Sequence, residues 1–187
     1  MNAIILASGF SKRMGKNKLL MTIGEEVILQ RVIREIKKSR IKNIILVARE
    51  DSVINLGIKE GITVVKNDFA ILGQSYSIKL GLAKVDLNNN FMFFCGDQPF
   101  IDRYSINKLI DFSFKFKENI IIPRVIDKIG SPIIFPKYLK GELELLEGDV
   151  GGKEVIKNNQ NKVKYVDLDN EFFLQDIDTL EDYKKFI

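Results

Sequence analysis

The first twenty residues constrain the chain most, because an apolar run over residues 3–7 stops at Ser8-Gly9 and a cationic stretch follows. A second glycine, Gly15, lies inside that stretch. Its cations are Lys12, Arg13, Lys16 and Lys18. The pattern predicts a strand that enters a glycine-hinged loop. Such a loop suits a polyphosphate, because glycine lets backbone N–H groups approach oxygens while Arg and Lys supply positive charge.

Two common phosphate motifs do not fit this stretch. A P-loop has four residues between its glycines and then Lys-Ser/Thr. Here five residues separate Gly9 from Gly15, and Lys16 is followed by Asn17. The dinucleotide-binding fingerprint needs a glycine two residues after the first, where this chain has Ser11.

The stretch does resemble the Leu-Ala-Ala/Gly-Gly-x-Ser-x-Arg-Met-Gly-x-x-Lys opening of nucleotidyltransferases that make nucleotide-linked cofactors and sugars. The matching positions are Leu6, Ala7, Gly9, Ser11, Arg13, Met14, Gly15 and Lys18. Only Ser8 departs from the pattern. The resemblance implies that Arg13 and Lys18 bind the triphosphate and serve catalysis, and that residues 6–9 bind the nucleotide. Those four are Leu6, Ala7, Ser8 and Gly9. The alternative is a lysine-rich surface loop without a ligand.

Length and composition bound the kind of protein. A chain of 187 residues with 45% hydrophobic residues predicts a single globular domain over 1–187. The net charge of +4 comes from cations scattered among acidic residues, so the sequence predicts no nucleic-acid partner. A modest positive excess favours anionic small molecules.

The numbers of cysteines and histidines and the hydropathy limit the compartment and the kinds of catalysis that the protein can use. The single cysteine, Cys95, allows no intrachain disulfide, which fits a reducing compartment. We expect Cys95 to be a buried hydrophobic residue and not a nucleophile. No stretch approaches eighteen apolar residues and the start lacks a signal-peptide pattern, so we expect a cytoplasmic protein without a membrane partner. The absence of histidine excludes Ser-His catalysis and histidine-ligated zinc.

Hydrophobic periodicity predicts alternating strands and helices. Strands are expected at 3–7, 43–48, 62–66, 91–95, 120–125 and 131–135. Helices are expected at 27–38, 51–60, 74–85, from Ser105 onward, at 139–146 and after Thr179, which is placed to cap the last one. The stretch 112–116 alternates like a strand, so the end of the fourth helix stays open. A turn at 127–130 would make the last two strands an antiparallel hairpin.

This order predicts an α/β protein with a three-layer αβα architecture and a mostly parallel, Rossmann-like sheet carrying a late antiparallel hairpin. The resemblance implies the nucleotide-diphospho-sugar transferase type of this fold. In such sheets ligands collect beyond the carboxyl ends of the strands. That rule places Ser8-Gly9, Asn67 and Asp97 on one rim.

Asp97 is the leading metal-ligand candidate. It follows an apolar strand and Gly96, so its carboxylate would sit where a divalent cation can bridge it to phosphate oxygens. A plain turn is the alternative, since Asp-Gln-Pro is good turn chemistry. Gly96-Asp97-Gln98-Pro99 also resembles the Gly-Asp-x-Pro motif of the same nucleotidyltransferases, in which the aspartate holds magnesium. The resemblance therefore implies a catalytic, Mg²⁺-binding Asp97.

A second pair of carboxylates lies near the end of the chain. Asp176 and Asp178 are two apart, so on an extended segment they point to the same side and either could complete the metal site. The segment resembles the family ending Asp-Ile-Asp-Thr-Pro-Glu-Asp, with Leu180 in place of the proline. We favour Asp178 as the ligand and leave Asp176 open. The alternative is that Asp178 or Thr179 merely caps the last helix.

Two further stretches extend the resemblance. Residues 67–77 resemble the segment that meets the base and sugar of the nucleotide, which implies binding roles for Asn67, Gly73 and Ser75. A strand-to-helix loop capped by Ser75 is the alternative. The acceptor-side motifs Gly-x-Pro and Gly-Asp-x-Gly-x-Arg imply acceptor binding by Gly130, Pro132, Asp149 and Gly151. Lys153 replaces the arginine of the second motif and cannot make its bidentate contact.

Together these motifs resemble the molybdenum cofactor cytidylyltransferases of the MobA-like NTP transferase family. The resemblance implies transfer of CMP from CTP to the phosphate of Mo-molybdopterin, with Mg²⁺ as cofactor, pyrophosphate as product, and a molybdoenzyme or its chaperone as partner. The alternatives are a cytidylyl- or guanylyltransferase acting on another pterin, sugar or polyol phosphate, and a non-catalytic cofactor-delivery chaperone of the same fold.

Overall fold

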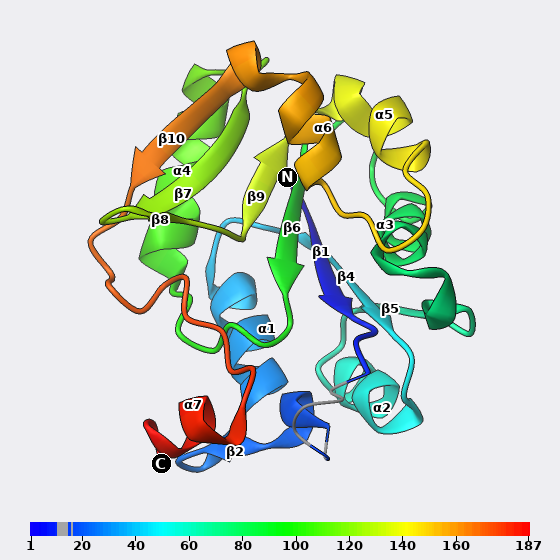
Figure 1. The fold of residues 1–187 in the computed structure, drawn as a ribbon, viewed down its shortest axis with the longest axis vertical. Helices are drawn as coiled ribbons and strands as arrows, with labels where there is room; N and C mark the ends of the chain where they lie inside the picture. The colour runs from blue at the N-terminus through cyan, green and yellow to red at the C-terminus, as the bar shows by residue number, and fades with distance from the viewer. Residues whose placement is uncertain (11–14, 16) are drawn as a thin grey trace.

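The computed structural model describes residues 1–10, 15 and 17–187. Within these ranges one sheet holds eight strands in the order β10-β7-β9-β6-β1-β4-β5, with β8 beside β7 (Figure 1). The strands are β1 Asn2–Ala7, β4 Asn43–Ala48, β5 Thr63–Lys66, β6 Phe91–Cys95, β7 Ile120–Val125, β8 Lys128–Ile129, β9 Ile133–Phe135 and β10 Val163–Asp167.

The sheet is mostly parallel, as predicted. β1 pairs in parallel with β4 and β6, β4 with β5, and β7 with β10. β9 runs antiparallel between β6 and β7, and β8 antiparallel to β7. The predicted antiparallel element is therefore present, but its turn lies earlier than 127–130, because β8 pairs Lys128 with Val125.

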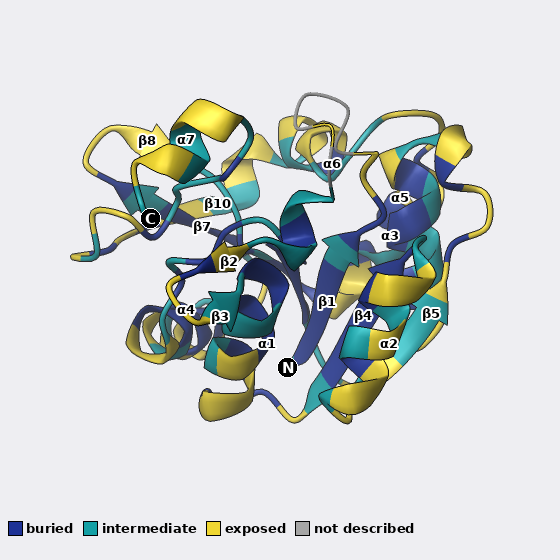
Figure 2. Cartoon of the chain, turned by 90° about the horizontal axis from the view of Figure 1, so that it is seen from below, coloured by how far each residue is buried: buried dark blue, intermediate teal, exposed yellow. Residues whose placement is uncertain are grey.

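Helices cover both faces of the sheet, which makes three layers (Figure 1). One face carries α1 Ile28–Lys38, α2 Asp51–Lys59 and α4 Arg103–Lys115, and the other carries α3 Gln74–Leu82, α5 Lys140–Glu144 and α6 Lys153–Asn158. Neighbouring residues of β1 show why: Ile5 packs into the core with Val32 of α1, whereas Ile4 packs with Ile78 of α3. Figure 2 shows β1 and β4 almost wholly buried and the outer side of α2 exposed. The three-layer fold class is confirmed.

Smaller elements lie at one end of the molecule. They are the 3-10 helix η1 Lys18–Leu20, the antiparallel strands β2 Thr22–Ile23 and β3 Glu26–Val27, and the C-terminal helix α7 Leu180–Lys184. The 3-10 helix η2 Ala70–Leu72 lies between β5 and α3. Thr179 caps α7 in a capping box with Asp182, as its sequence predicted. Further 3-10 turns are η3 Lys137–Leu139 and η4 Gln160–Lys162.

Two predictions of helix boundaries were wrong, and the structure decides a third boundary that the sequence left open. α4 begins at Arg103 because Asp102, not Ser105, is its N-cap: the Asp102 carboxylate accepts hydrogen bonds from the backbone N–H groups of Tyr104 and Ser105. Residues 112–115 of the alternating stretch belong to α4 and Phe116 is its C-cap; the buried residues Ile106, Leu109, Ile110 and Ser113 follow the spacing of one helical face. α3 ends at Leu82, three residues before the predicted end.

Gly81 in α3 has a packing role. A β-carbon built there would lie 2.5 Å from Cγ2 of Ile4, so the glycine lets α3 approach β1 closely.

Sequence reasoning missed α6 and the edge strand β10. No helix among the described residues is long and apolar enough to cross a membrane.

The parallel strands bring the predicted loops to one rim. β1 and β6 are in register, with Leu6 opposite Cys95, so the residues that follow them, Ser8-Gly9 and Asp97, emerge side by side. The backbone N–H of Asn67, after β5, donates to the carbonyl of Ala48 at the end of β4.

Candidate active site

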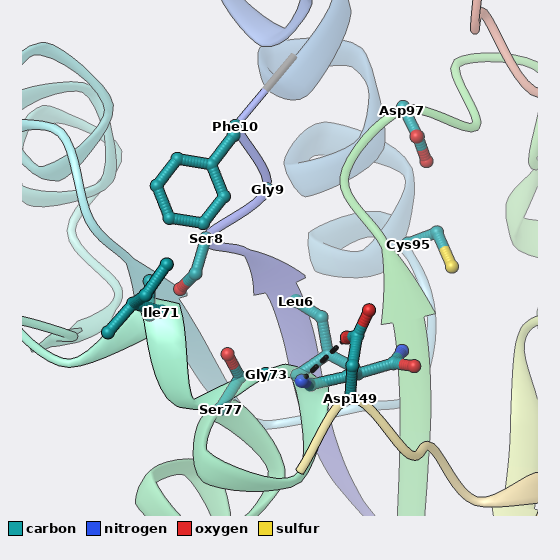
Figure 3. A pocket seen from close by; sticks show the side chains of 12 residues that line it. Leu6, Ser8, Gly9, Phe10, Ile71, Gly73, Ser77, Cys95, Asp97 and Asp149 are labelled. Carbon is teal, nitrogen blue, oxygen red and sulfur yellow. Dashed lines mark hydrogen bonds between the residues drawn. The ribbon is translucent and has the colours of Figure 1, made fainter. Parts of the chain in front are cut away.

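A continuous hollow lies along this rim. One cavity has a volume of about 430 Å³, and Figure 3 shows the side chains that line it. A second cavity of about 480 Å³ shares Leu6, Gly9, Phe10, Asp97 and Asp149 with the first. A third of about 290 Å³ extends the hollow toward β9 and α6 and shares Leu6 and Asp149 with the other two. The hollow is therefore long enough to offer connected compartments for two ligands.

The floor of the hollow is the end of β1. Leu6, Ala7, Ser8 and Gly9, which were predicted to bind nucleotide, all line one or both of the first two cavities. The Ser8 hydroxyl is buried and donates to the backbone carbonyl of Val47 at 3.2 Å, which ties the loop to β4. Arg13 lies outside the described residues.

Phe10 is a wall residue that the motif left unspecified. Its exposed ring borders both cavities, and the Arg49 guanidinium carbon lies 4.6 Å from the ring centroid. Arg49 pairs in turn with Glu50 at 2.6 Å, and Glu50 accepts a hydrogen bond from Asn17. Only its place directly after Gly9 could have pointed to Phe10.

Lys18, Asp97 and Asp178 meet at the edge of the second cavity. The Lys18 Nζ atom lies 2.5 Å from Oδ2 of Asp97 and 2.6 Å from Oδ1 of Asp178. The three side chains come from η1, the end of β6 and the segment before α7. Two carboxylates and an ammonium therefore converge from three distant parts of the chain.

The backbone explains this convergence. The N–H of Ile177 donates to the carbonyl of Asp97 at 3.1 Å, and the Ile177 side chain is fully buried with Ile23 and Ile28. On the other side, Asn17 caps η1 by accepting from the N–H of Leu19, whose side chain is in the core. Lys18 and Asp178 thus project from fixed backbone.

Burial and charge act in opposite directions at this cluster. Burial disfavours the Lys18 ammonium, but the negative charges and hydrogen bonds of Asp97 and Asp178 outweigh it and raise the Lys18 pKa. For Asp176, burial together with the nearby charge of Asp97 raises the pKa to about 6. Asp178, by contrast, contacts Lys18 and lines the cavity.

Asp97 and Asp178 fit a magnesium site by their chemistry. Mg²⁺ in substrate complexes is usually held by one or two carboxylates together with phosphate oxygens and water. Both carboxylates already approach a single cation, the Lys18 ammonium. Across the described ranges no group of three or more His, Cys, Asp or Glu residues is placed to hold a metal ion.

Hydrogen bonds also join the start of α3 to the loop before α6, and this contact is called the α3–α6 junction below. The backbone N–H of Gln74 donates to Oδ1 of Asp149 at 3.1 Å, shown dashed in Figure 3. Ser75 donates from both its N–H and its hydroxyl to the carbonyl of Gly148. Gly73 has φ of 94°, and a β-carbon there would lie 2.4 Å from the Gly148 oxygen.

This junction changes how the predicted binding residues should be interpreted. Ser75 and Asp149 were assigned to opposite substrates, yet their polar groups hold the same two segments together. Asn67 is fully buried, donates to the Ser77 hydroxyl and accepts from the N–H of Phe69. Ser77, which the sequence reasoning missed, lines the first cavity instead. Nothing in the sequence distinguishes the two serines.

The acceptor-side residues divide into two groups. Asp149 and Gly151 line the third cavity with Lys153, Ser131 and Cys95. Gly130 and Pro132 do not line any of these three cavities, and Gly130 faces Leu174.

Cys95 is a half-buried wall residue. Burial, with the nearby charge of Asp97, raises the pKa of its thiol to about 12. At neutral pH the sulfur is therefore a protonated thiol and a poor nucleophile.

The fold is shared with proteins of known structure, one of which is named a nucleotidyl transferase. A homolog of Mycobacterium tuberculosis Rv0371c from Mycobacterium sp. strain JC1 superposes with a TM-score of 0.85 at 24% identity, covering 98% of this chain and 93% of that one. A nucleotidyl transferase from Methanothermobacter thermautotroptrophicus superposes with a TM-score of 0.83 at 17% identity, covering 98% and 94%. At these identities the likeness establishes the fold.

The sequence then identifies the family. Residues 3–163 match the MobA-like NTP transferase domain, and the chain belongs to this family of nucleotidyltransferases. It is 25% identical to the purine catabolism protein PucB of Bacillus subtilis (strain 168), over 96% of this chain and 92% of that protein. It is 26% identical to 3-deoxy-manno-octulosonate cytidylyltransferase of Rickettsia felis, over 66% of this chain and only 51% of that enzyme.

Proposed function

We propose that this protein is a Mg²⁺-dependent cytidylyltransferase that moves CMP from CTP onto the phosphate of Mo-molybdopterin. The observation that carries the proposal is the meeting of Lys18, Asp97 and Asp178 beside the cleft at the ends of β1 and β6. Nucleotidyl transfer needs a triphosphate held in line and its developing charge neutralised, and little covalent help from protein. A cation-binding pair of carboxylates with an adjacent lysine meets that need.

In the proposed reaction an oxygen of the acceptor phosphate attacks the α-phosphorus of CTP. The bond from that phosphorus to the β-phosphate oxygen breaks, and pyrophosphate leaves. Lys18 and Arg13 bind the departing phosphates, while Asp97 and Asp178 hold the metal. When bound, Mg²⁺ supplies Lewis-acid neutralisation worth roughly several kcal/mol.

The nucleotide is assigned to the two cavities above β1, with Leu6, Ala7, Ser8 and Gly9 beneath it and Gly73 at the side. Asn67 and Ser75 support the nucleotide site indirectly. Asn67 positions Ser77 through a hydrogen bond, and Ser75 holds the 148–149 segment through the carbonyl of Gly148. The acceptor is assigned to the third cavity, which Asp149, Gly151 and Lys153 line. Gly130 and Pro132 shape the chain on either side of Ser131, which lines that cavity.

CTP as the donor is supported by the Rickettsia relative, which is named a cytidylyltransferase. A divalent metal is supported by a structural neighbour, Rv0371c of Mycobacterium tuberculosis, whose crystal structure is described as a manganese complex. The proposal treats 1–187 as one nucleotidyltransferase domain acting in the cytoplasm, with a molybdoenzyme or its chaperone receiving the product.

A second candidate is cytidylyl transfer to a sugar acid such as 3-deoxy-manno-octulosonate. The same Rickettsia relative supports it, because its name specifies that acceptor. The two candidates share the donor and the leaving pyrophosphate. They differ in the acceptor that fills the third cavity and in the oxygen that attacks the α-phosphorus, which belongs to a phosphate in the first and to a hydroxyl group, which loses its proton, in the second.

Pyrophosphate release from each of the four nucleoside triphosphates tests both, with Mo-molybdopterin or 3-deoxy-manno-octulosonate as acceptor and with or without Mg²⁺. We expect release from CTP with molybdopterin and Mg²⁺. Preference for GTP would reject the choice of base, and turnover only with the sugar acid would favour the second candidate. Asp97→Asn should lower the rate by about a hundredfold or more, whereas Asp167→Asn, at a surface ion pair with Arg124, should not.

A further inference from the structure

The Lys18 ammonium occupies the position between the two carboxylates that the proposed function assigns to a divalent cation. Nζ is within 2.6 Å of an oxygen of each, and the side chains are 14%, 21% and 46% exposed for Lys18, Asp97 and Asp178. A metal ion held by Asp97 and Asp178 would need the space that the Lys18 ammonium now fills. The two cations therefore exclude each other sterically and by charge.

We propose that Lys18 is a built-in competitor of the metal: its ammonium holds Asp97 and Asp178 together until a triphosphate draws it away, and the metal then takes its place. The inference rests on the proposed metal site. It assigns Lys18 two successive partners, carboxylates before substrate binds and phosphate oxygens afterward.

The chain allows this exchange without moving its backbone. Asn17 caps η1 and Leu19 is anchored in the core, so the Cα of Lys18 stays in place. The side chain, however, is a flexible four-carbon stem that ends in three N–H donors. Lys18, Asp97 and Asp178 all line the same cavity of about 480 Å³, which gives the stem room to turn.

The exchange makes triphosphate and metal binding cooperative. A triphosphate competes with Asp97 and Asp178 for the ammonium, because phosphate oxygens accept equally strong charge-assisted hydrogen bonds. Each ligand then removes an obstacle to the other, and by linkage the coupling is reciprocal. The carboxylates are also kept from repelling each other before substrate arrives.

The opposing interpretation is that Lys18 is a permanent strut that fixes the 176–178 segment to the end of β6. The two interpretations differ in what removal of the ammonium does to metal binding. Removal of a competitor takes the ammonium away from the two carboxylates and leaves a tighter metal site. A strut, once removed, lets the carboxylates separate and weakens the site.

The test is Mn²⁺ binding to the full chain without nucleotide, measured from the signal of free Mn²⁺ by electron paramagnetic resonance. We expect Lys18→Gln to bind Mn²⁺ about tenfold or more tightly than the unmodified protein. Lys18→Arg keeps a competing cation, so its affinity should stay near that of the unmodified protein. Lys66→Gln is the matched control, because Lys66 also lies between two carboxylates, Asp51 and Asp68, but on another part of the surface. It should change nothing.

Urea unfolding of each variant establishes that it is folded. Equal or weaker Mn²⁺ binding by folded Lys18→Gln would overturn the inference while leaving the metal site intact, provided that Asp97→Asn abolishes binding. If Lys18→Gln does not fold, Lys18→Arg takes its place as the test. Mn²⁺ binding by Lys18→Arg that is tenfold tighter than binding by the unmodified protein would overturn the inference. If none of the proteins binds Mn²⁺, the metal site of the proposed function fails as well.

Discussion

Ile177 donates its backbone N–H to the carbonyl of Asp97 at 3.1 Å, and this contact joins the C-terminal segment to the central sheet. The hydrogen bond holds Asp178 close enough to Asp97 for both carboxylates to contact the Lys18 ammonium. The pair of carboxylates proposed to hold the metal is thus brought together from residues 81 positions apart through one buried isoleucine and one backbone hydrogen bond.

Ile177→Ala should therefore cost stability and metal binding together. The side chain is fully buried against Ile23 and Ile28, and truncating such a residue costs about 2–5 kcal/mol. Urea unfolding measures the cost, with Ile187→Ala as the control because that side chain is 69% exposed. Equal unfolding free energies for the two variants would show that Ile177 does not anchor the segment.

Gly73→Ala should break the junction between α3 and the loop before α6. The substitution places a β-carbon 2.4 Å from backbone at Gly148 in a region of positive φ, which costs about 1–3 kcal/mol. Gly141→Ala is the control: nothing lies within 4 Å of its β-carbon position, and alanine in a helix is neutral or stabilising by up to about 1 kcal/mol. Thermal unfolding that ranks Gly141→Ala below Gly73→Ala would contradict this account.

The N-cap of α4 should make stability depend on pH in the acid range. Burial alone would raise the Asp102 pKa, but hydrogen bonds from Asn170, Ser105 and Tyr104 lower it overall. A carboxyl group whose pKa is lower in the folded state stabilises that state at pH values above its unfolded pKa of about 3.9. The contribution is lost as the pH falls through the pKa of the folded state.

Asp102→Ala should accordingly be less stable by about 0.5–2 kcal/mol near pH 7, with the difference shrinking below about pH 4. Urea unfolding from pH 7 to pH 3 measures it. Asp169→Ala is the comparison, because Asp169 is almost fully exposed and pairs only with Lys108 in the part of the chain described here. A difference for Asp102→Ala that grows on acidification would have the wrong sign.

Cys95 should resist alkylation in the native protein. With a pKa of about 12, its thiolate fraction at pH 8 is far below that of an ordinary cysteine. Iodoacetamide should react roughly a hundredfold or more slowly with native than with urea-unfolded protein. Comparable rates in the two states would show that the thiol is not shielded at the cleft wall.

Sequence reasoning succeeded where a motif is local. The strand before Ser8-Gly9, the placement of Asp97 after β6 and the Thr179 cap each depend on a few neighbouring residues, and the structure has all three. The parallel order followed from alternating periodicity, since crossovers between parallel strands are constrained.

It failed where the outcome depends on tertiary contacts. No pattern in the sequence could reveal that Lys18 lies between Asp97 and Asp178, or that Ser75 bonds to Gly148 rather than facing the cleft. Asp102, not Ser105, caps α4, and its carboxylate also accepts a hydrogen bond from Asn170, which is distant in sequence. The strand β10 was missed because an edge strand carries little apolar alternation.

The central claim is that the protein transfers a nucleotidyl group, and the fate of the α-phosphate tests it most directly. CTP labelled with ³²P at the α-position is incubated with Mo-molybdopterin, Mg²⁺ and the protein, and the acceptor is then isolated. The account predicts that label appears on the acceptor in equal amount to the pyrophosphate released, and that Asp97→Asn lowers the rate of both by about a hundredfold or more. Label that stays on free CTP, or an acceptor labelled only from γ-³²P-CTP, would contradict it.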